Sequence, residues 1–180
     1  MISLTKKERE VLLLIFKDFT CFYNANSISK TLKISHVGAQ KIFKRLLKEN
    51  IVTNRTIGKS IIYKVNFNNS YVCQLMIFLL ADEANNFNRW KEEFRELFKE
   101  GRIVMLFGSA IKDYTKAKDI DLMIVIDKKD IKEVNNILIK KEEILPKKLH
   151  SIKLTYDDLL NNIKKKQEAI IDIVKNAVIL

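Results

Sequence analysis

The hydrophobic positions in the first third of the chain recur with the period of an α-helix in three successive stretches. Thr5 followed three residues later by Glu8 is a capping-box pattern at the start of the first stretch, and Ser35 has the position of a cap before the third. The predicted helices span residues 4–19, 28–32 and 35–49. Two runs rich in β-formers then flank a turn at 57–59, which predicts a hairpin over 51–66.

The third predicted helix carries one apolar stripe and one polar face. The stripe consists of Val37, Ile42, Phe43, Leu46 and Leu47. The other face consists of His36, Gln40, Lys41, Lys44, Arg45 and Lys48. We expect the stripe to pack inward and the basic face to remain exposed.

The second half of the chain predicts strands alternating with helices. Ile103 to Phe107 is an unbroken apolar run, typical of a strand buried on both faces, and it ends at the dipeptide Gly108-Ser109. A second apolar run begins with Asp119-Ile120-Asp121. Because residues i and i+2 of a strand face the same way, both carboxylates project from one side of it. We further expect helices over 71–83, 87–99, 127–144 and 156–175, and strands over 149–155 and 177–180.

The net charge of +11 is concentrated at the N-terminal end. Residues 1–70 hold 13 Lys and Arg against 4 Asp and Glu, whereas residues 71–180 hold 20 against 18. A basic segment of this size indicates a polyanion-binding module attached to a nearly neutral second domain. The longest apolar runs, Val11–Phe16 and Leu75–Ala81, are too short to cross a bilayer, and no basic-then-apolar leader opens the chain, so we expect a cytoplasmic protein without a membrane span.

Gly108-Ser109 and the aspartate pair have the chemistry of a metal–nucleotide site. A glycine lets the backbone come close to a ligand, and a serine there can cap a following helix whose N–H groups point at an anion. Two carboxylates on one side of a strand repel each other unless a cation lies between them. Mg²⁺ or Mn²⁺ binds carboxylates together with phosphate oxygens.

The sequence Gly-Ser, nine residues, then Asp-Ile-Asp-Leu resembles the signature of polymerase-beta-type nucleotidyltransferases, especially the minimal nucleotidyltransferase family. The resemblance implies that Gly108 and Ser109 bind a nucleoside triphosphate and that Asp119 and Asp121 bind Mg²⁺ or Mn²⁺ as the catalytic metal ligands. Active members usually carry a third carboxylate on the strand corresponding to 149–155, and none is present here. Whether His150 or Asp157 replaces it stays open, and so does whether the domain is an active enzyme.

The first 67 residues resemble a winged helix-turn-helix domain of the bacterial and archaeal regulator type, through their element order and the segment Ser35-His-Val-Gly-Ala-Gln-Lys-Ile-Phe-Lys-Arg-Leu-Leu. The third helix of such a domain lies in the major groove of duplex DNA, and its wing contacts the DNA backbone or the minor groove. The resemblance implies base contacts from Ser35, His36, Gln40 and Lys41, and phosphate contacts from Lys44, Arg55 and Lys59. Winged helices also serve as protein-interaction modules, which is the alternative.

We therefore expect an α+β protein with a DNA-binding winged helix-turn-helix domain at 1–67, connecting helices at 68–101 and a nucleotidyltransferase-like mixed sheet flanked by helices at 102–180. The function expected first is a DNA-binding protein that binds a Mg–nucleoside triphosphate and transfers a nucleotidyl group to a hydroxyl. The alternative is a non-catalytic transcription regulator that uses a degenerate nucleotidyltransferase fold to sense a ligand or bind a partner such as a toxin. The apolar helix 71–83 packs between domains or pairs two subunits as a homodimer, and these alternatives also stay open.

Overall fold

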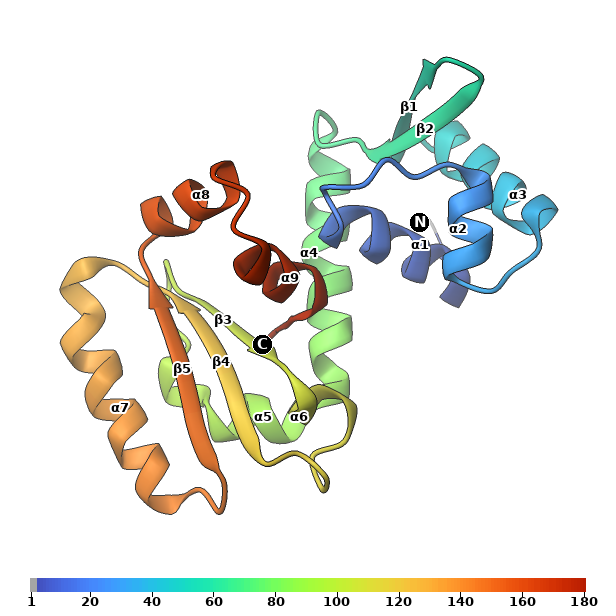
Figure 1. Cartoon of the computed structure of the whole chain (residues 1–180). Coiled ribbons are helices and arrows are strands. Elements are labelled where there is room, and N and C mark those ends of the chain that lie inside the picture. The colour runs from blue at the N-terminus through green and yellow to red at the C-terminus, as the bar shows by residue number, and fades with distance from the viewer. Residues whose placement is uncertain (1–2) are drawn as a thin grey trace. The chain divides into compact units, whose positions relative to one another are not determined.

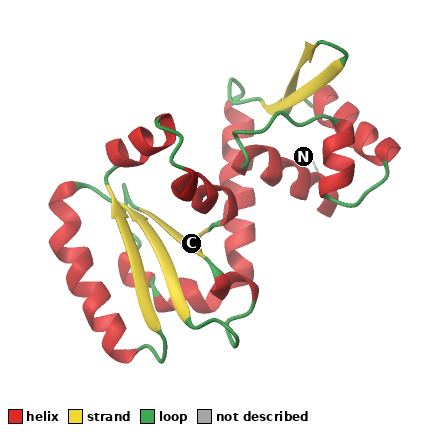
Figure 2. Ribbon diagram, viewed as in Figure 1, coloured by secondary structure: helices red, strands yellow, loops and turns green. Residues whose placement is uncertain are grey.

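The computed structural model describes residues 3–180, and the chain divides into two compact units, residues 1–80 and 81–180. Each unit contains helices and a β-sheet of its own (Figure 2), so the α+β class expected from the sequence is confirmed. The division falls inside one helix, Ser70–Ala84, and not at the polar break after Phe67. The boundaries 1–67, 68–101 and 102–180 stay a prediction.

The first unit has the element order of a winged helix-turn-helix domain (Figure 1). Its elements are α1 (Lys6–Lys17), α2 (Ala25–Thr31), α3 (His36–Lys48), β1 (Val52–Ile57), β2 (Ser60–Val65) and the first part of α4 (Ser70–Ala84). The antiparallel strands β1 and β2 form the wing. Apolar side chains of the three helices, the wing and α4 share one core, in which Phe43 stacks on Tyr63 with ring centroids 3.8 Å apart.

Two local details of the first unit differ from the prediction. Helix α2 begins at Ala25, earlier than expected, because the side chain of Asn24 accepts a hydrogen bond from the backbone N–H of Ser27 and caps the helix there. Val37, which the sequence predicts in the buried stripe of α3, is 58% exposed. Ala39 is buried instead, because it lies four residues before Phe43 on the same face of the helix, whereas Val37 lies six residues before Phe43 and off that face.

Glu8 is the main buried charge of the first unit, with 3% of its surface exposed. It completes the predicted capping box with Thr5 and also accepts hydrogen bonds from Nη1 of Arg45 at 3.0 and 2.9 Å. Arg45 therefore anchors α3 to the start of α1 and is not simply part of the solvated basic face.

The second unit is a four-stranded mixed sheet with helices on both faces. Its strands are β3 (Ile103–Phe107), β4 (Asp119–Val125), β5 (Lys148–Leu154) and β6 (Val178–Ile179). The strand order is β5-β4-β3-β6, with β4 and β5 parallel and the other pairs antiparallel. Its helices are η1 (Asn85–Phe87), α5 (Asn88–Glu93), η2 (Arg95–Leu97), α6 (Ser109–Lys112), η3 (Lys128–Asp130), α7 (Ile131–Ile144), α8 (Tyr156–Lys164) and α9 (Glu168–Asn176).

The alternation of side chains along β4 separates two cores. On one face Ile120, Leu122 and Ile124 pack with α5 and α7. On the other face Met123 and Val125 pack with α8 and α9, seen in orange and red in Figure 1. Asp119 and Asp121 project by parity from this second face, at the start of β4, where the core of that face stops.

The helix expected over 87–99 is broken in the structure. Its residues form α5 and the 3₁₀ turn η2, with Phe94 between them outside the helical region at φ −103° and ψ 16°. Trp90, Phe94 and Leu97 are buried as core residues, whereas Phe98 is 37% exposed. Within residues 3–180, no helix is both long and apolar enough to cross a membrane.

Candidate functional site

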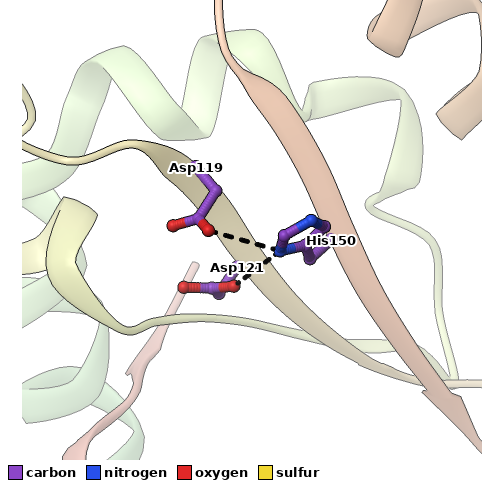
Figure 3. Close-up of side chains that lie close together, drawn as sticks. All are labelled: Asp119, Asp121 and His150. Atoms are coloured by element: carbon purple, nitrogen blue, oxygen red, sulfur yellow. Dashed lines mark ion pairs between the residues drawn. The ribbon is translucent and has the colours of Figure 1, made fainter.

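Asp119, Asp121 and His150 form a cluster at the end of the sheet (Figure 3). The two aspartates lie two residues apart on β4, and His150 lies on the neighbouring parallel strand β5, directly opposite Asp121 in the strand register. Nδ1 of His150 is 3.4 Å from Oδ2 of Asp119 and 3.6 Å from Oδ1 of Asp121. The close-up shows the imidazole ring directed at both carboxylates. The predicted aspartate pair is therefore joined by a side chain from another strand.

Gly108 brings the turn after β3 against this cluster. Its backbone has φ +76° and ψ −153°, a conformation that residues with a Cβ rarely adopt. A Cβ at this position would lie 2.2 Å from Oδ2 of Asp121. The glycine is therefore required both by the backbone angle and by the close approach of the carboxylate.

Ser109 is exposed and begins α6, a helix of four residues. The N-cap position of α6 belongs to Gly108, and no side chain caps the helix there. The expectation that Ser109 caps the helix is therefore wrong in this detail, because the chain is already helical at the serine. The exposed hydroxyl of Ser109 stays available to a ligand.

The electrostatics of the cluster favour a bound cation. Burial raises the pKa of the Asp121 carboxyl, the negative charge of Asp119 raises it further, and His150 opposes the shift. The physical cause is that two carboxylates share a partly dehydrated corner of the sheet. A positive charge placed between them relieves both the repulsion and the loss of hydration.

Lys147, which directly precedes β5, holds the loop between α6 and β4 in place. Its Nζ donates hydrogen bonds to the carbonyl oxygens of Tyr114 and Ala117 and lies 4.3 Å from the centre of the Tyr114 ring. The guanidinium carbon of Arg89 lies 3.9 Å from the centre of the same Tyr114 ring. These contacts fix the segment that leads directly into Asp119, so the position of the carboxylate is set by residues that the sequence motif does not include.

An open cavity of about 650 Å³ lies next to the Gly108 turn. Its walls come from the end of β3, from α6 and from α9. The polar side chains that line it are Ser109, Lys112, Asp172 and Asn176. This volume is within the range of roughly 300–1,000 Å³ that is usual for small-molecule sites.

The donor set fits a divalent cation. One ligand atom from each of Asp119, Asp121 and His150 can be chosen so that all three lie within 4.8 Å of one another. Two carboxylates and an imidazole nitrogen are ordinary ligands for divalent metals. The residues present therefore fit the metal that the nucleotidyltransferase resemblance implies.

The residues expected to contact DNA are all exposed on the first unit. Ser35 precedes α3, and His36, Gln40, Lys41 and Lys44 lie along that helix, while Arg55 and Lys59 lie on the wing and at its tip. His36, Gln40 and Lys59 line one shared surface depression of about 270 Å³. The structure thus brings part of the expected base-reading set together with the wing. Arg55 lines a separate depression on the wing.

His150 and Asp157 are the two residues that the sequence offers in place of the missing carboxylate, and the structure brings His150 to the aspartates. Asp157 lies on α8 and is not part of the cluster. Farther along β5, Ile152 and Lys153 pair with Met123 and Ile124, away from the cluster. Only the register between β4 and β5 places His150 opposite Asp121, and the sequence does not show this register.

Comparison with solved structures gives weak likenesses. The adhesin competence repressor AdcR of Streptococcus pyogenes has a TM-score of 0.40 and 14% identity, covering 79% of this chain and 82% of that chain. A mutant of Lactococcus lactis ZitR in complex with DNA has a TM-score of 0.39 and 14% identity, covering 52% of this chain and 64% of that chain. At such TM-scores we draw nothing from these proteins about this one. No curated protein matches the chain.

The family comparison is more informative. The model of the nucleotidyltransferase domain matches residues 88–180, which is more than half of the chain. The match covers the Gly108 turn, the cluster on β4 and β5, and the cavity beside α9. The chain therefore belongs to the nucleotidyltransferase domain family.

Proposed function

We propose that this chain is a DNA-binding protein whose nucleotidyltransferase domain binds a nucleoside triphosphate with a divalent cation and transfers a nucleotidyl group to a hydroxyl acceptor. One observation carries the proposal: the Gly108 turn touches the carboxylate of Asp121, and the same turn forms a wall of the cavity beside α9. A phosphate chain in contact with the turn would therefore reach the aspartates at one end and the cavity at the other.

Each part of the site has a role in this proposal. The backbone of Gly108 and the hydroxyl of Ser109 contact the triphosphate, and Asp119 and Asp121 hold the cation. A bound divalent cation would supply charge neutralisation on the phosphate oxygens. The nucleoside would occupy the cavity, where Nδ2 of Asn176 donates to Oδ1 of Asp172 at 2.9 Å and fixes a polar wall on α9.

Transfer of a nucleotidyl group makes one bond and breaks another. The oxygen of the acceptor hydroxyl bonds to the α-phosphorus and its proton passes to solvent. The bond from the α-phosphorus to the bridging oxygen breaks, and pyrophosphate leaves with that electron pair. This chemistry requires positioning and charge stabilisation more than covalent participation by the protein.

The first unit would bind duplex DNA through α3 and the wing. Support comes from the exposure of all seven expected contact residues and from the net charge of +9 on residues 1–70. Because each phosphate contact releases condensed counterions, affinity for DNA should fall steeply with salt. A flat salt response would contradict this part of the proposal. A cytoplasmic location and a homodimer remain predictions.

A second candidate is a non-catalytic regulator that binds a nucleotide and does not turn it over. The observation that favours it is the third strand, where His150 occupies the position opposite Asp121 and the described strand β5 carries no carboxylate. Losing one anchoring carboxylate should slow the chemical step more than nucleotide binding.

The test uses the full chain with labelled nucleoside triphosphates, Mg²⁺ or Mn²⁺, and a cell extract as the source of acceptors. Binding and transfer are measured for the wild type, for Asp119→Asn with Asp121→Asn, and for a control with Asp127→Asn and Asp157→Asn. The control removes the same charge from exposed positions outside the cluster. Loss of binding only in the first double variant supports the site. Wild-type binding without transfer selects the second candidate, and equal binding by all three proteins refutes both.

A further inference from the structure

His150 is placed where a third metal ligand would stand. In a parallel pair, residues in register lie on the same face of the sheet about 4.8 Å apart. His150 is in register with Asp121, so its side chain leaves the sheet on the face that carries both aspartates. It is 59% exposed, so no packing requirement explains why its ring is directed at the carboxylates.

We infer that His150 is a direct ligand of the cation through Nδ1, and that it makes this site prefer a first-row transition-metal ion to Mg²⁺. The inference rests on the proposed function, because it assumes a cation at Asp119 and Asp121. It deepens that proposal by naming the class of metal.

The separations within the cluster match those between ligands of one ion. Metal–nitrogen and metal–oxygen bonds of about 2.1 Å hold neighbouring ligand atoms about 3.0–3.4 Å apart in octahedral or tetrahedral geometry. Nδ1 lies 3.4 and 3.6 Å from the two carboxylate oxygens. Both distances are longer than the roughly 2.7–3.2 Å of a good N–H···O hydrogen bond. A small contraction around an ion would therefore complete the coordination.

The choice of metal follows from the nitrogen ligand. Mg²⁺ is a hard ion that takes oxygen ligands in near-ideal octahedral geometry, whereas imidazole suits the later first-row ions. Replacing a carboxylate by an imidazole also removes one negative charge from the site. Both effects lower the affinity for Mg²⁺ relative to Mn²⁺, Co²⁺ or Zn²⁺.

A different role for His150 predicts the opposite result. If the protonated imidazole only neutralises the aspartates, it competes with every cation for them. Removing it would then raise the affinity for all metals, including Mg²⁺. If it is a ligand, removing it lowers the affinity for transition-metal ions and leaves Mg²⁺ binding little changed.

The experiment measures binding of Mg²⁺, Mn²⁺, Co²⁺ and Zn²⁺ salts to the full chain by calorimetry, and follows the visible absorption of bound Co²⁺. The variants are His150→Ala, His150→Asp and the control Lys153→Ala, an exposed cation on the opposite face of the same strand. We expect His150→Ala to weaken Co²⁺ and Zn²⁺ binding by about tenfold or more and to change the Co²⁺ spectrum. His150→Asp should reduce the preference of the site for Mn²⁺, Co²⁺ and Zn²⁺ over Mg²⁺. The control Lys153→Ala should bind all four metals as the wild type does.

Equal or tighter binding of all four metals by His150→Ala would overturn the inference. The outcome can be separated from failure of the proposed function by the double variant of Asp119 and Asp121. If that variant binds every metal as the wild type does, the proposed site itself is wrong. If it loses metal binding while His150→Ala does not, only the inference about His150 is wrong. Circular dichroism checks that each variant remains folded.

Discussion

Gly108→Ala perturbs the junction between the turn and the aspartates. The φ of +76° and ψ of −153° at this position belong to a region that costs a residue with a Cβ about 1–3 kcal/mol. The new Cβ would also lie 2.2 Å from Oδ2 and 3.1 Å from Cγ of Asp121, so one of the two groups must move. The substitution therefore combines backbone strain with displacement of a proposed metal ligand.

Rotation of the Asp121 side chain is the easiest relief, because the clashing oxygen is at its far end. This rotation carries the carboxylate away from its present position 3.6 Å from Nδ1 of His150. We expect metal-dependent binding of a triphosphate to weaken by about tenfold or more, equivalent to at least about 1.4 kcal/mol. Calorimetry with and without the metal measures this loss, and urea unfolding measures the stability.

Gly101→Ala is the matched control. Gly101 also has a positive φ, of +80°, but a Cβ there would meet nothing within 4 Å. It should lose stability on the same scale of about 1–3 kcal/mol and keep its affinity for the metal–triphosphate. If Gly108→Ala binds as tightly as Gly101→Ala, the turn and the aspartates do not form one site and the reasoning is refuted.

Three further predictions concern the first unit. Lys44→Ala should weaken binding to all duplex sequences alike, whereas Gln40→Ala should change the sequence preference. Fluorescence anisotropy on a set of duplex sequences measures both effects. Equal losses of affinity on every sequence from both variants would mean that α3 does not read bases. Arg45→Met leaves the buried Glu8 without its cation and should lower the free energy of unfolding by about 1–3 kcal/mol. Urea unfolding measures this loss. An unchanged urea midpoint would show that the Arg45–Glu8 ion pair contributes nothing to stability. Burial raises the pKa of Tyr23, so the unfolded chain loses this proton first. The protonated Tyr23 hydroxyl therefore contributes to the free energy of unfolding below about pH 10, and this contribution falls as the pH rises further. In urea unfolding experiments between about pH 9 and 11, Tyr23→Phe should lose stability less steeply with pH than the wild type.

The parts of the site that could be predicted from the sequence are those that depend on local geometry. The common face of Asp119 and Asp121 follows from the two-residue period of a strand. The turn at Gly108 follows from a glycine at the end of an apolar run, and the structure shows the close approach to Asp121 that makes the glycine necessary. A few residues that are neighbours in the sequence are enough to specify these two features.

The sequence alone does not decide between His150 and Asp157 as the missing ligand, because the answer depends on the register between β4 and β5. The whole of α7 separates these strands in the chain, and no local pattern fixes which residue of β5 faces Asp121. The same holds for Lys147, whose contacts with Tyr114 and Ala117 arise only when the sheet has formed. Long-range pairings of this kind are set by tertiary packing.

The fold shows the same division between local and long-range information. The capping box at Thr5 is confirmed because its hydrogen bonds lie within one helical turn. The helix over 87–99 is broken because Phe94 takes a non-helical conformation while its ring is buried in the sheet core, an effect of packing that helical periodicity does not report. The wall that α9 contributes to the cavity likewise depends on its docking against β3.

The most direct measurement is a crystal structure of the full chain with Mn²⁺ and a non-hydrolysable nucleoside triphosphate, in which anomalous scattering locates the metal. The expected result is a metal between Asp119 and Asp121, phosphates against Gly108 and Ser109, and the nucleoside in the cavity beside α9. A metal held by other residues, or a nucleotide bound away from the Gly108 turn, would contradict the central claim that these elements form a single nucleotide site.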